Sequence, residues 1–190
     1  MMLRKPWTAV LILLLAVGAT AQETTTPEYQ VEVLVVRNLN PSTGTEVFPL
    51  NIEEEEPVET SEESTEIETT TITAETFLAL DEGELTLTEM ADKIRRSRNF
   101  RVVNHSGWTQ PGFSRDDAVP KVFLTTASTG ESVNGYIVLS RERYLRLALD
   151  LTMQIDEDQF QLNTQRRMIS RQLHYFDNPY FGVIAKITPL

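Results

Sequence analysis

The 190-residue sequence contains no cysteine. This absence excludes disulfide bonds, thiolate catalysis, cysteine-ligated zinc and a lipid-modified N-terminal cysteine, so the stability of the fold must come from core burial. Histidine is almost as scarce. The two histidines, His105 and His174, lie in no H-E-x-x-H or H-x-H arrangement, so a zinc site would need distant carboxylates as partners.

Catalytic signatures are also lacking. The sequence has no G-x-S-x-G elbow, no S-x-x-K and no phosphate-binding loop. A glycosidase needs two carboxyl groups at a defined separation, and Asp150 with Asp177 is the only such pair expected in ordered segments. His174 and Asp177 lead into an Asn-Pro turn, where local hydrogen bonding accounts for both. The sequence therefore predicts a protein that is not an enzyme and that uses no metal and no cofactor.

The one long apolar run is at the N-terminus. Residues 1–21 have the layout of a secretory signal peptide, with basic residues at 4–5, an apolar stretch at 7–17 and an A-x-A cleavage site that ends at Ala21. The stretch is shorter than the ~20 residues of a spanning helix. We expect export to a bacterial periplasm, a flexible N-terminus at 22–28 and no membrane span in the mature chain.

The formal net charge of −11 is unevenly distributed. Residues 1–84 carry 17 acidic and 3 basic side chains, whereas residues 85–190 carry 11 acidic and 14 basic side chains, which leaves this part at +3. The acidic excess lies in a Glu-, Thr- and Ser-rich interval at about 38–84 that buries too little to offset the entropy of ordering it. We expect a disordered insertion inside a single domain, 29–190, whose basic remainder suits an anionic polymer or an acidic partner.

Hydrophobic periodicity predicts the secondary structure of the first half of the domain. Residues 29–37 form a valine-rich strand that is apolar on both faces, as in the centre of a sheet. The sequence T-L-T-E at 86–89 is a capping box, and it predicts an amphipathic helix over roughly 87–98. Further strands are expected at 100–105 and around 121–125.

The second half of the domain is predicted to be β-structure. Leucines alternate with polar residues over 144–154, which indicates a half-buried antiparallel strand. Its partner, 159–175, changes phase midway, which predicts a bulge, and strands at 136–140 and 181–188 complete the sheet. The predicted fold class is α+β, a mostly antiparallel β-sheet packed with one main amphipathic helix.

The residues that remain suit recognition. Guanidinium groups pair with carboxylates in two-point contacts, and aromatic faces suit the apolar faces of sugar rings. Arginines at 141, 143 and 146 are expected on a neighbouring strand, and Tyr180 offers a further ring. A basic edge strand that prevents aggregation, with its aromatic rings in the core, is the alternative. The candidate ligand-binding residues are Arg166, Arg167, Arg171, His174, Tyr175, Asp177, Trp108 and His105.

Three blocks of sequence resemble the CsiV family of Gram-negative periplasmic proteins. They are YQVEVLVVR at 29–37, FRVVNHSGWTQPG at 100–112 and RRMISRQLHYFDNPYFGVIAKITP at 166–189. The third is the most specific, and together the blocks cover about half of the mature chain. The family pattern has an acidic residue and a histidine where this chain has Gln172 and Asn178. The second difference weakens any metal or acid–base role for this turn.

The resemblance implies a non-enzymatic periplasmic protein that binds peptidoglycan and supports cell-wall synthesis and cell-shape integrity. It also implies assistance to a penicillin-binding synthase through the lipoprotein activator of that synthase. It implies no partner among nucleic acids, and no binding residues are carried over from the family. Two alternatives remain: a cell-wall turnover hydrolase that uses Asp150, His174 or Asp177, and a protein–protein adaptor of the envelope.

Overall fold

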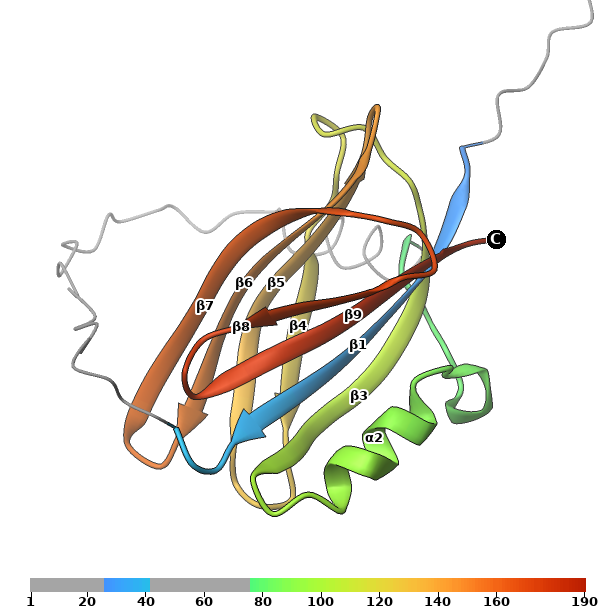
Figure 1. Ribbon diagram of the computed structural model, residues 1–190. Helices are drawn as coiled ribbons and strands as arrows, with labels where there is room; N and C mark the ends of the chain where they lie inside the picture. Colours follow the sequence, from blue (N-terminus) through green and yellow to red (C-terminus); the bar gives the residue numbers. More distant parts are fainter. Residues whose placement is uncertain (1–25, 42–75) are drawn as a thin grey trace, which may run out of the picture.

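The computed structural model describes residues 26–41 and 76–190 (Figure 1). The expected signal peptide, most of the expected flexible N-terminus and residues 42–75 of the acidic interval lie outside the described residues. The described elements are β1 (Glu28–Asn38), β2 (Leu78–Ala79), the 3₁₀ helix η1 (Glu82–Glu84), α2 (Thr88–Arg95), β3 (Phe100–Pro111), β4 (Lys121–Thr126), β5 (Ser132–Arg141), β6 (Leu145–Ile155), β7 (Asp158–Met168), β8 (Leu173–Asp177) and β9 (Phe181–Pro189).

The strands form two sheets in which every pairing is antiparallel. The first sheet has the order β2-β3-β1-β9-β8, and the second has the order β4-β5-β6-β7. The sheets face each other and approach at two seams, where β7 lies near β8 and β3 near β4. The predicted class, a mostly antiparallel β-structure packed with one main amphipathic helix, is confirmed for residues 26–41 and 76–190. The division of the strands into two sheets was not predicted.

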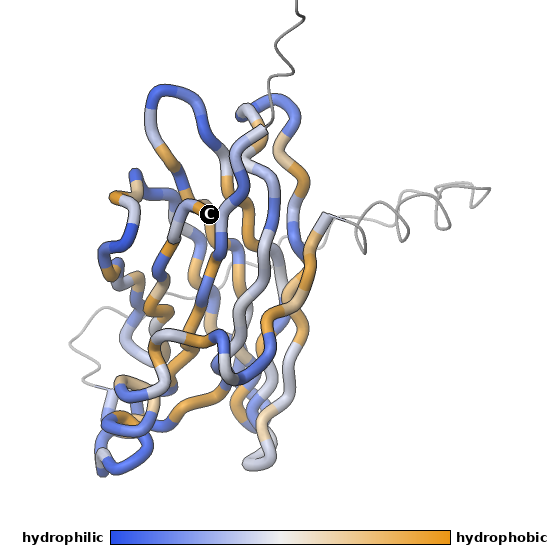
Figure 2. The backbone as a smooth tube through the Cα atoms, turned by 90° about the vertical axis from the view of Figure 1, so that its right-hand side faces the viewer, coloured by the Kyte–Doolittle hydropathy of each residue, from blue (hydrophilic) through white to orange (hydrophobic). Residues whose placement is uncertain are grey.

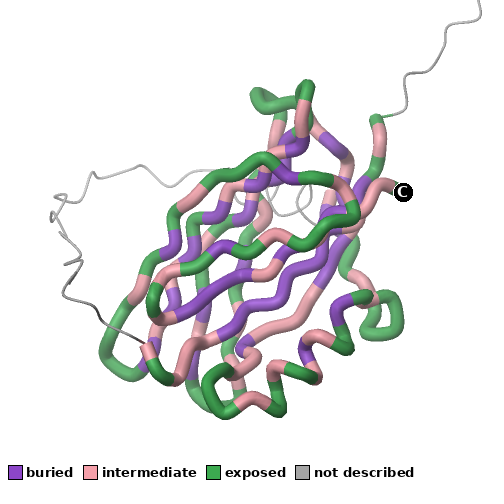
Figure 3. The backbone as a smooth tube through the Cα atoms, viewed as in Figure 1, coloured by how far each residue is buried: buried purple, intermediate pink, exposed green. Residues whose placement is uncertain are grey.

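The main core fills the space between the two sheets. The predicted alternation of β6 is confirmed, since its odd-numbered residues from Leu145 to Ile155 are buried and its even-numbered residues are not (Figure 3). Figure 2 shows the same alternation of hydrophobic and hydrophilic residues along the strands. The largest side chains that are almost completely buried are Trp108, Phe176 and Phe181. Each contributes about 3 kcal/mol of apolar burial.

Strand β1 lies between β3 and β9, which confirms the expected central strand. Its odd-numbered residues from Tyr29 to Val35 point into the main core. Its even-numbered residues include Leu34 and Val36, which pack against Ala91 of α2 on the outer face of the sheet. Helix α2 covers this outer face over β1 and β3 (Figure 1). The two apolar faces of β1 therefore serve two separate hydrophobic clusters.

The N-terminus of α2 differs from the prediction. The helix begins at Thr88 and ends at Arg95, and no side chain of its own N-cap residue, Leu87, binds its first turn. Instead the carboxylate of Glu32 on β1 accepts hydrogen bonds from the Thr86 hydroxyl (2.7 Å) and from the backbone N–H groups of Thr86 (3.0 Å) and Leu87 (2.8 Å). The predicted local capping box is replaced by a carboxylate 54 residues earlier in the chain.

The predicted bulge in the C-terminal strand is wrong. Strand β7 ends at Met168, the chain crosses to the other sheet, and β8 begins at Leu173. Arg171 in this crossover has a φ of 65°, and its N–H donates to the carbonyl of Ile187 (2.7 Å). The change of hydrophobic phase therefore marks a change of sheet.

The last part of the acidic interval is ordered. Phe77 is buried in the main core, and β2 pairs with the outer edge of β3. The side chain of Glu84 accepts a hydrogen bond from the N–H of Asp81 (2.8 Å), which closes the turn of η1. The apolar residues 77–80 interrupt the acidic composition, and the burial of Phe77 in the main core stabilises the ordered conformation of this stretch.

One buried carboxylate joins the two sheets. Glu131, in the loop between β4 and β5, is 2% exposed and binds Arg37 of β1 (2.5 Å) and Arg101 of β3 (2.7 Å). Its other oxygen accepts the hydroxyl of Thr129. Arg37 and Arg101 are direct cross-strand neighbours, so the negative charge of Glu131 offsets the repulsion between two like charges.

Candidate functional site

Two of the candidate ligand-binding residues lie inside the protein. Trp108 is 1% exposed, and its indole N–H donates to the side-chain oxygen of Gln110 (2.7 Å). His105 lies next to α2, and its Nε2 donates to the carboxylate of Glu32 (2.8 Å). Both side chains are occupied by structural contacts, and neither shares a surface with the candidate arginines.

Arg166 and Arg167 point to opposite faces of β7. The guanidinium of Arg166 reaches across the seam, where it donates to the carbonyl of Tyr175 (3.1 Å) and lies 5.4 Å from the centre of the Phe176 ring. Arg167 points outward, and its guanidinium stacks 3.4 Å from the centre of the Tyr144 ring. Arg166 therefore closes the seam between the sheets, whereas Arg167 is presented to solvent.

The residues that follow are divided between the crossover and β8. His174 accepts a hydrogen bond at Nε2 from the N–H of Ile169 (3.0 Å), which holds the crossover that contains Arg171. Tyr175 and Asp177 point outward from the first sheet, on the same face as α2. Burial, followed by the negative charge of Asp177, raises the pKa of the Tyr175 phenol. The candidate residues thus do not form one continuous surface.

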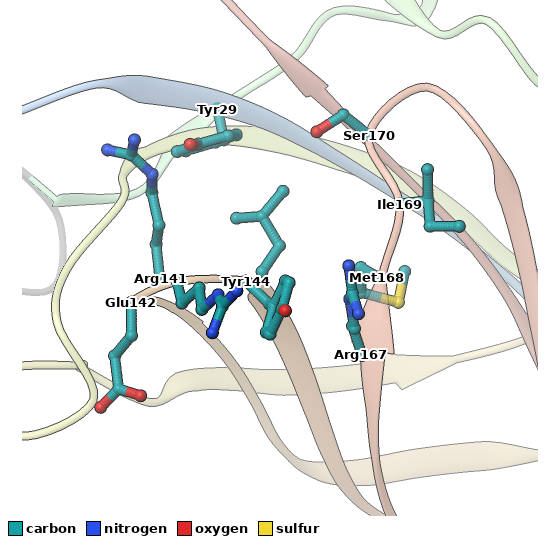
Figure 4. A pocket seen from close by; sticks show the side chains of 10 residues that line it. Tyr29, Arg141, Glu142, Tyr144, Arg167, Met168, Ile169 and Ser170 are labelled. Carbon is teal, nitrogen blue, oxygen red and sulfur yellow. The ribbon is translucent and has the colours of Figure 1, made fainter.

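Arg167 lines a hollow of about 310 Å³ that we call the cationic hollow (Figure 4). The turn between β5 and β6, the end of β7 and the start of β1 form its walls. The side chains of Arg141, Tyr144, Arg167 and Tyr29 are arranged around it, and the carboxylate of Glu142 points away. The lining residues are Tyr29, Arg141, Glu142, Arg143, Tyr144, Leu145, Arg167, Met168, Ile169 and Ser170.

The arginines of the cationic hollow have no carboxylate partner among the residues that the structure describes. Two of them lie near the ring of Tyr144, with Arg167 at 3.4 Å and Arg143 at 5.4 Å from the ring centre. Arg146 is the direct cross-strand neighbour of Arg167, so like charges lie side by side. Such a cluster favours an anionic ligand that pairs with the guanidinium groups.

Tyr29, Tyr144 and Ser170 were not predicted as candidate residues. Tyr29 comes from the other sheet, so no local pattern places it here. Tyr144 was predictable in principle, since the turn at 156–158 sets the β6–β7 register and places Leu145 opposite Met168. That register pairs Arg146 with Arg167, so Tyr144, two residues before Arg146 on the same face of the sheet, is the diagonal neighbour of Arg167.

Two classes of site are not found in the described part of the chain. No group of three or more His, Asp or Glu side chains is arranged to hold a metal ion within residues 26–41 and 76–190. In the same ranges, no helix has both the length and the apolar character needed to cross a bilayer.

The described part of the chain thus combines two facing sheets with an open, arginine-lined hollow. The model of the family described as "Peptidoglycan-binding protein, CsiV" matches residues 7–190. The chain belongs to the CsiV family, and the resemblance in the three sequence blocks is confirmed. No curated protein matches the chain, and no solved structure matches it. The family description names a binding activity and an envelope polymer.

Proposed function

We propose that this protein binds peptidoglycan in the periplasm without catalysis, and that the cationic hollow is the contact for the carboxylates of its stem peptides. The observation that carries the proposal is the group of arginines around the Tyr144 ring, which lack carboxylate partners in the described chain. Stem peptides end in carboxylates, and a guanidinium binds a carboxylate through two parallel hydrogen bonds.

The arrangement of the hollow also supports binding. Stacking on Tyr144 restricts the guanidinium of Arg167, so less side-chain freedom is lost when a ligand binds. Ser170, which lines the hollow on the crossover, offers a hydroxyl that both donates and accepts hydrogen bonds. A ligand with a carboxylate and neighbouring amide groups fits this combination.

Replacing Arg143 and Arg167 together by alanine is expected to lower retention on isolated peptidoglycan sacculi by about tenfold, because two charge-assisted contacts are lost. A pull-down with purified protein and quantified bound fractions measures the effect. Binding of the wild-type protein to sacculi should also weaken as the salt concentration is raised from roughly 0.05 to 0.5 M. At the higher concentration the Debye length is roughly 4 Å, so the attraction between exposed charges is largely screened.

The matched control is the pair Arg96→Ala and Arg98→Ala. Both arginines are exposed, follow directly on α2 and do not line the cationic hollow, and the control removes the same charge. Equal losses in both double variants would mean that only the net charge matters and would contradict the assignment of the hollow. Release of soluble muropeptides from sacculi incubated with the wild-type protein would favour the hydrolase alternative.

A second observation favours a role beside a protein partner. Val122 and Leu124 of β4 and Tyr136 of β5 form a row on the outer face of the second sheet, and they are 57%, 75% and 51% exposed. An exposed apolar group of this kind is typical of protein contacts. We propose that this apolar row contacts the lipoprotein activator of a penicillin-binding synthase, through which the protein supports cell-wall synthesis and cell shape.

Leu124→Glu is expected to weaken binding to that purified activator by about tenfold or more, since a charge is placed in an apolar contact. The affinity can be measured with the immobilised activator. Thr126→Glu adds the same charge on the same face of β4 but outside the apolar row, and it should have little effect. Sacculus retention should be unchanged in both variants; a parallel loss there would show that the row belongs to the polymer site.

A further inference from the structure

A second hollow of about 480 Å³ lies on the outer face of the first sheet, and we call it the aromatic hollow. It is formed where β1 ends, β3 begins and the chain turns from β8 to β9. Its residues are Asn38, Phe100, Tyr175, Asp177, Asn178 and Pro179. It shares no lining residue with the cationic hollow.

The ring of Tyr175 lies against the backbone of β9 at Gly182. A Cβ atom at position 182 would come within 2.6–2.8 Å of three atoms of the Tyr175 side chain, so glycine is what allows this close approach. The tyrosine still remains 49% exposed. One side of the ring is therefore supported by the sheet, and the rest of the side chain is open to solvent.

A second aromatic ring is exposed in the same hollow. Phe100, the direct cross-strand neighbour of Asn38, is 39% exposed. Packing on Gly182 of the neighbouring strand explains the position of Tyr175. It does not explain why Phe100 is exposed in the same hollow. Two rings that line one concave surface are typical of a ligand site with an apolar contact face.

The two amides of the hollow hold its walls. Asn38 donates from Nδ2 to the carbonyl of Pro179 (3.0 Å). The side-chain oxygen of Asn178 accepts the N–H groups of Tyr180 (2.8 Å) and Phe181 (2.9 Å), and its Nδ2 donates across the seam to the carbonyl of Gln161 (3.0 Å). These bonds fix the turn between β8 and β9, so the hollow is formed before any ligand arrives.

Two polar groups are left to face a ligand. Among the hydrogen bonds between described residues, none involves the Tyr175 hydroxyl or the Asp177 carboxylate. Asp177 is the one charged residue of the lining, and no lysine or arginine accompanies it. The aromatic hollow therefore repels carboxylates, and its ligand chemistry differs from that of the cationic hollow.

We propose that the aromatic hollow binds an uncharged pyranose ring, with Tyr175 as the stacking surface and Asp177 as the acceptor for ring hydroxyl groups. The C–H face of a pyranose is apolar and packs on an aromatic face, while its hydroxyls are hydrogen-bond donors that a carboxylate accepts. This inference rests on the proposed function, because it assigns the sugar part of the same polymer to a second site.

The test is a titration of ¹⁵N-labelled protein with chitotetraose, a neutral oligomer of N-acetylglucosamine. Backbone amide shifts are expected at Tyr175, Gly182 and Phe100 and not around Tyr144. Tyr175→Ala should weaken the binding by about tenfold, the upper end of what one aromatic contact contributes, whereas Tyr175→Phe keeps the ring and should retain most of it. Leu173→Ala is the matched control, since Leu173 points to the same face of β8 and is also 49% exposed.

Several results would overturn the inference. Absence of shifts at these amides in the folded wild-type protein would do so, as would equal affinity of Tyr175→Ala and the control. Preferential binding of lysine methyl ester would assign the hollow to an ammonium group instead. Sacculus retention without chitotetraose binding would overturn this inference alone, whereas chitotetraose binding without sacculus retention would contradict the proposed function and leave the sugar site standing.

Discussion

Glu32→Ala is expected to lower the free energy of unfolding by about 3 kcal/mol, because the loss of one buried carboxylate leaves several donors without a partner. Glu32 lies in the middle of β1, and the whole residue is 1% exposed. Burial by itself raises its pKa, but hydrogen bonds from Thr86, Leu87 and His105 outweigh this effect, and the pKa is lowered. The ionised carboxylate is therefore the form that holds α2 on the sheet.

The loss should be local as well as global. Without Glu32 the N–H of Leu87 has no partner at the start of α2, so the helix should open more readily than the strands beneath it. Chemical denaturation measures the total effect, and amide hydrogen exchange at Ala91, whose N–H donates to the carbonyl of Leu87 (2.8 Å), reports the local one. Glu157→Ala, at an exposed turn position, serves as the control and should stay within about 0.5 kcal/mol of the wild type.

A stability loss below about 1 kcal/mol, or equal exchange at Ala91 in both proteins, would show that α2 is held by its apolar contacts alone. Glu32→Gln separates charge from shape. The glutamine amide has one oxygen that accepts, but its N–H₂ group faces donors that need an acceptor. The stability of the Glu32→Gln variant should therefore lie between those of the wild type and the alanine variant.

Glu131→Gln is expected to cost about 2 kcal/mol at pH 7 and to remove a large part of the sensitivity of the fold to acid. Burial raises the pKa of Glu131, but hydrogen bonds from Thr129 and Arg37, its own backbone and Arg101 lower it from 4.5 to about 2. A shift of this size corresponds to roughly 3 kcal/mol as an upper value. The side chains of Arg37 and Arg101 are 25% and 39% exposed, so screening by solvent reduces this contribution to stability.

The direction of the pH dependence follows from the lowered pKa. The folded protein binds the proton on Glu131 less tightly than the unfolded chain does, so this stabilisation is complete above about pH 4.5 and is lost as the pH falls toward 2. Urea midpoints at pH 7, 4.5 and 3 should therefore fall more steeply for the wild type than for Glu131→Gln. Glu142→Gln, an exposed control, should follow the wild type. Parallel curves for all three proteins would contradict the role of Glu131.

Local patterns in the sequence were sufficient to predict most of the strands. The alternation around Leu149 fixed the inward face of β6, and the valines of β1 on both faces identified it as a central strand. Both patterns depend on side chains within one strand, where the period of two residues is enforced by the backbone itself. The class of fold followed from such periodicity, and the family followed from the resemblance of residues 29–37, 100–112 and 166–189; both are confirmed.

Features that depend on distant partners were missed. The phase change before Leu173 looks the same in the sequence whether the strand bulges or the chain moves to another sheet, and only the pairing of β8 with β9 separates the two. Residues 86–89 have the sequence of a capping box, but Glu32 of β1 provides a stronger, ionised acceptor for the start of α2. Trp108 and His105 were predicted as ligand-binding residues, but both side chains are buried. Alternation alone does not reveal that the second sheet and α2 cover the two faces of β3.

The candidate site divided for the same reason. Arg166 and Arg167 are adjacent in the sequence, and a β-strand sends adjacent side chains to opposite faces, so one closes a seam and the other meets Tyr144. Tyr175 and Asp177 were predicted beside these arginines. The crossover places them on the other sheet instead.

Strand β1 runs from one hollow to the other, since Tyr29 lines the first and Asn38 the second. Nine residue steps in a strand span about 30 Å. A polymer chain long enough to reach both ends gains an intramolecular second contact, and its avidity rises far above that of either contact alone. A short fragment has no such advantage. With both proposed sites in place, the length of β1 is expected to make the protein bind an intact polymer more tightly than its short breakdown products.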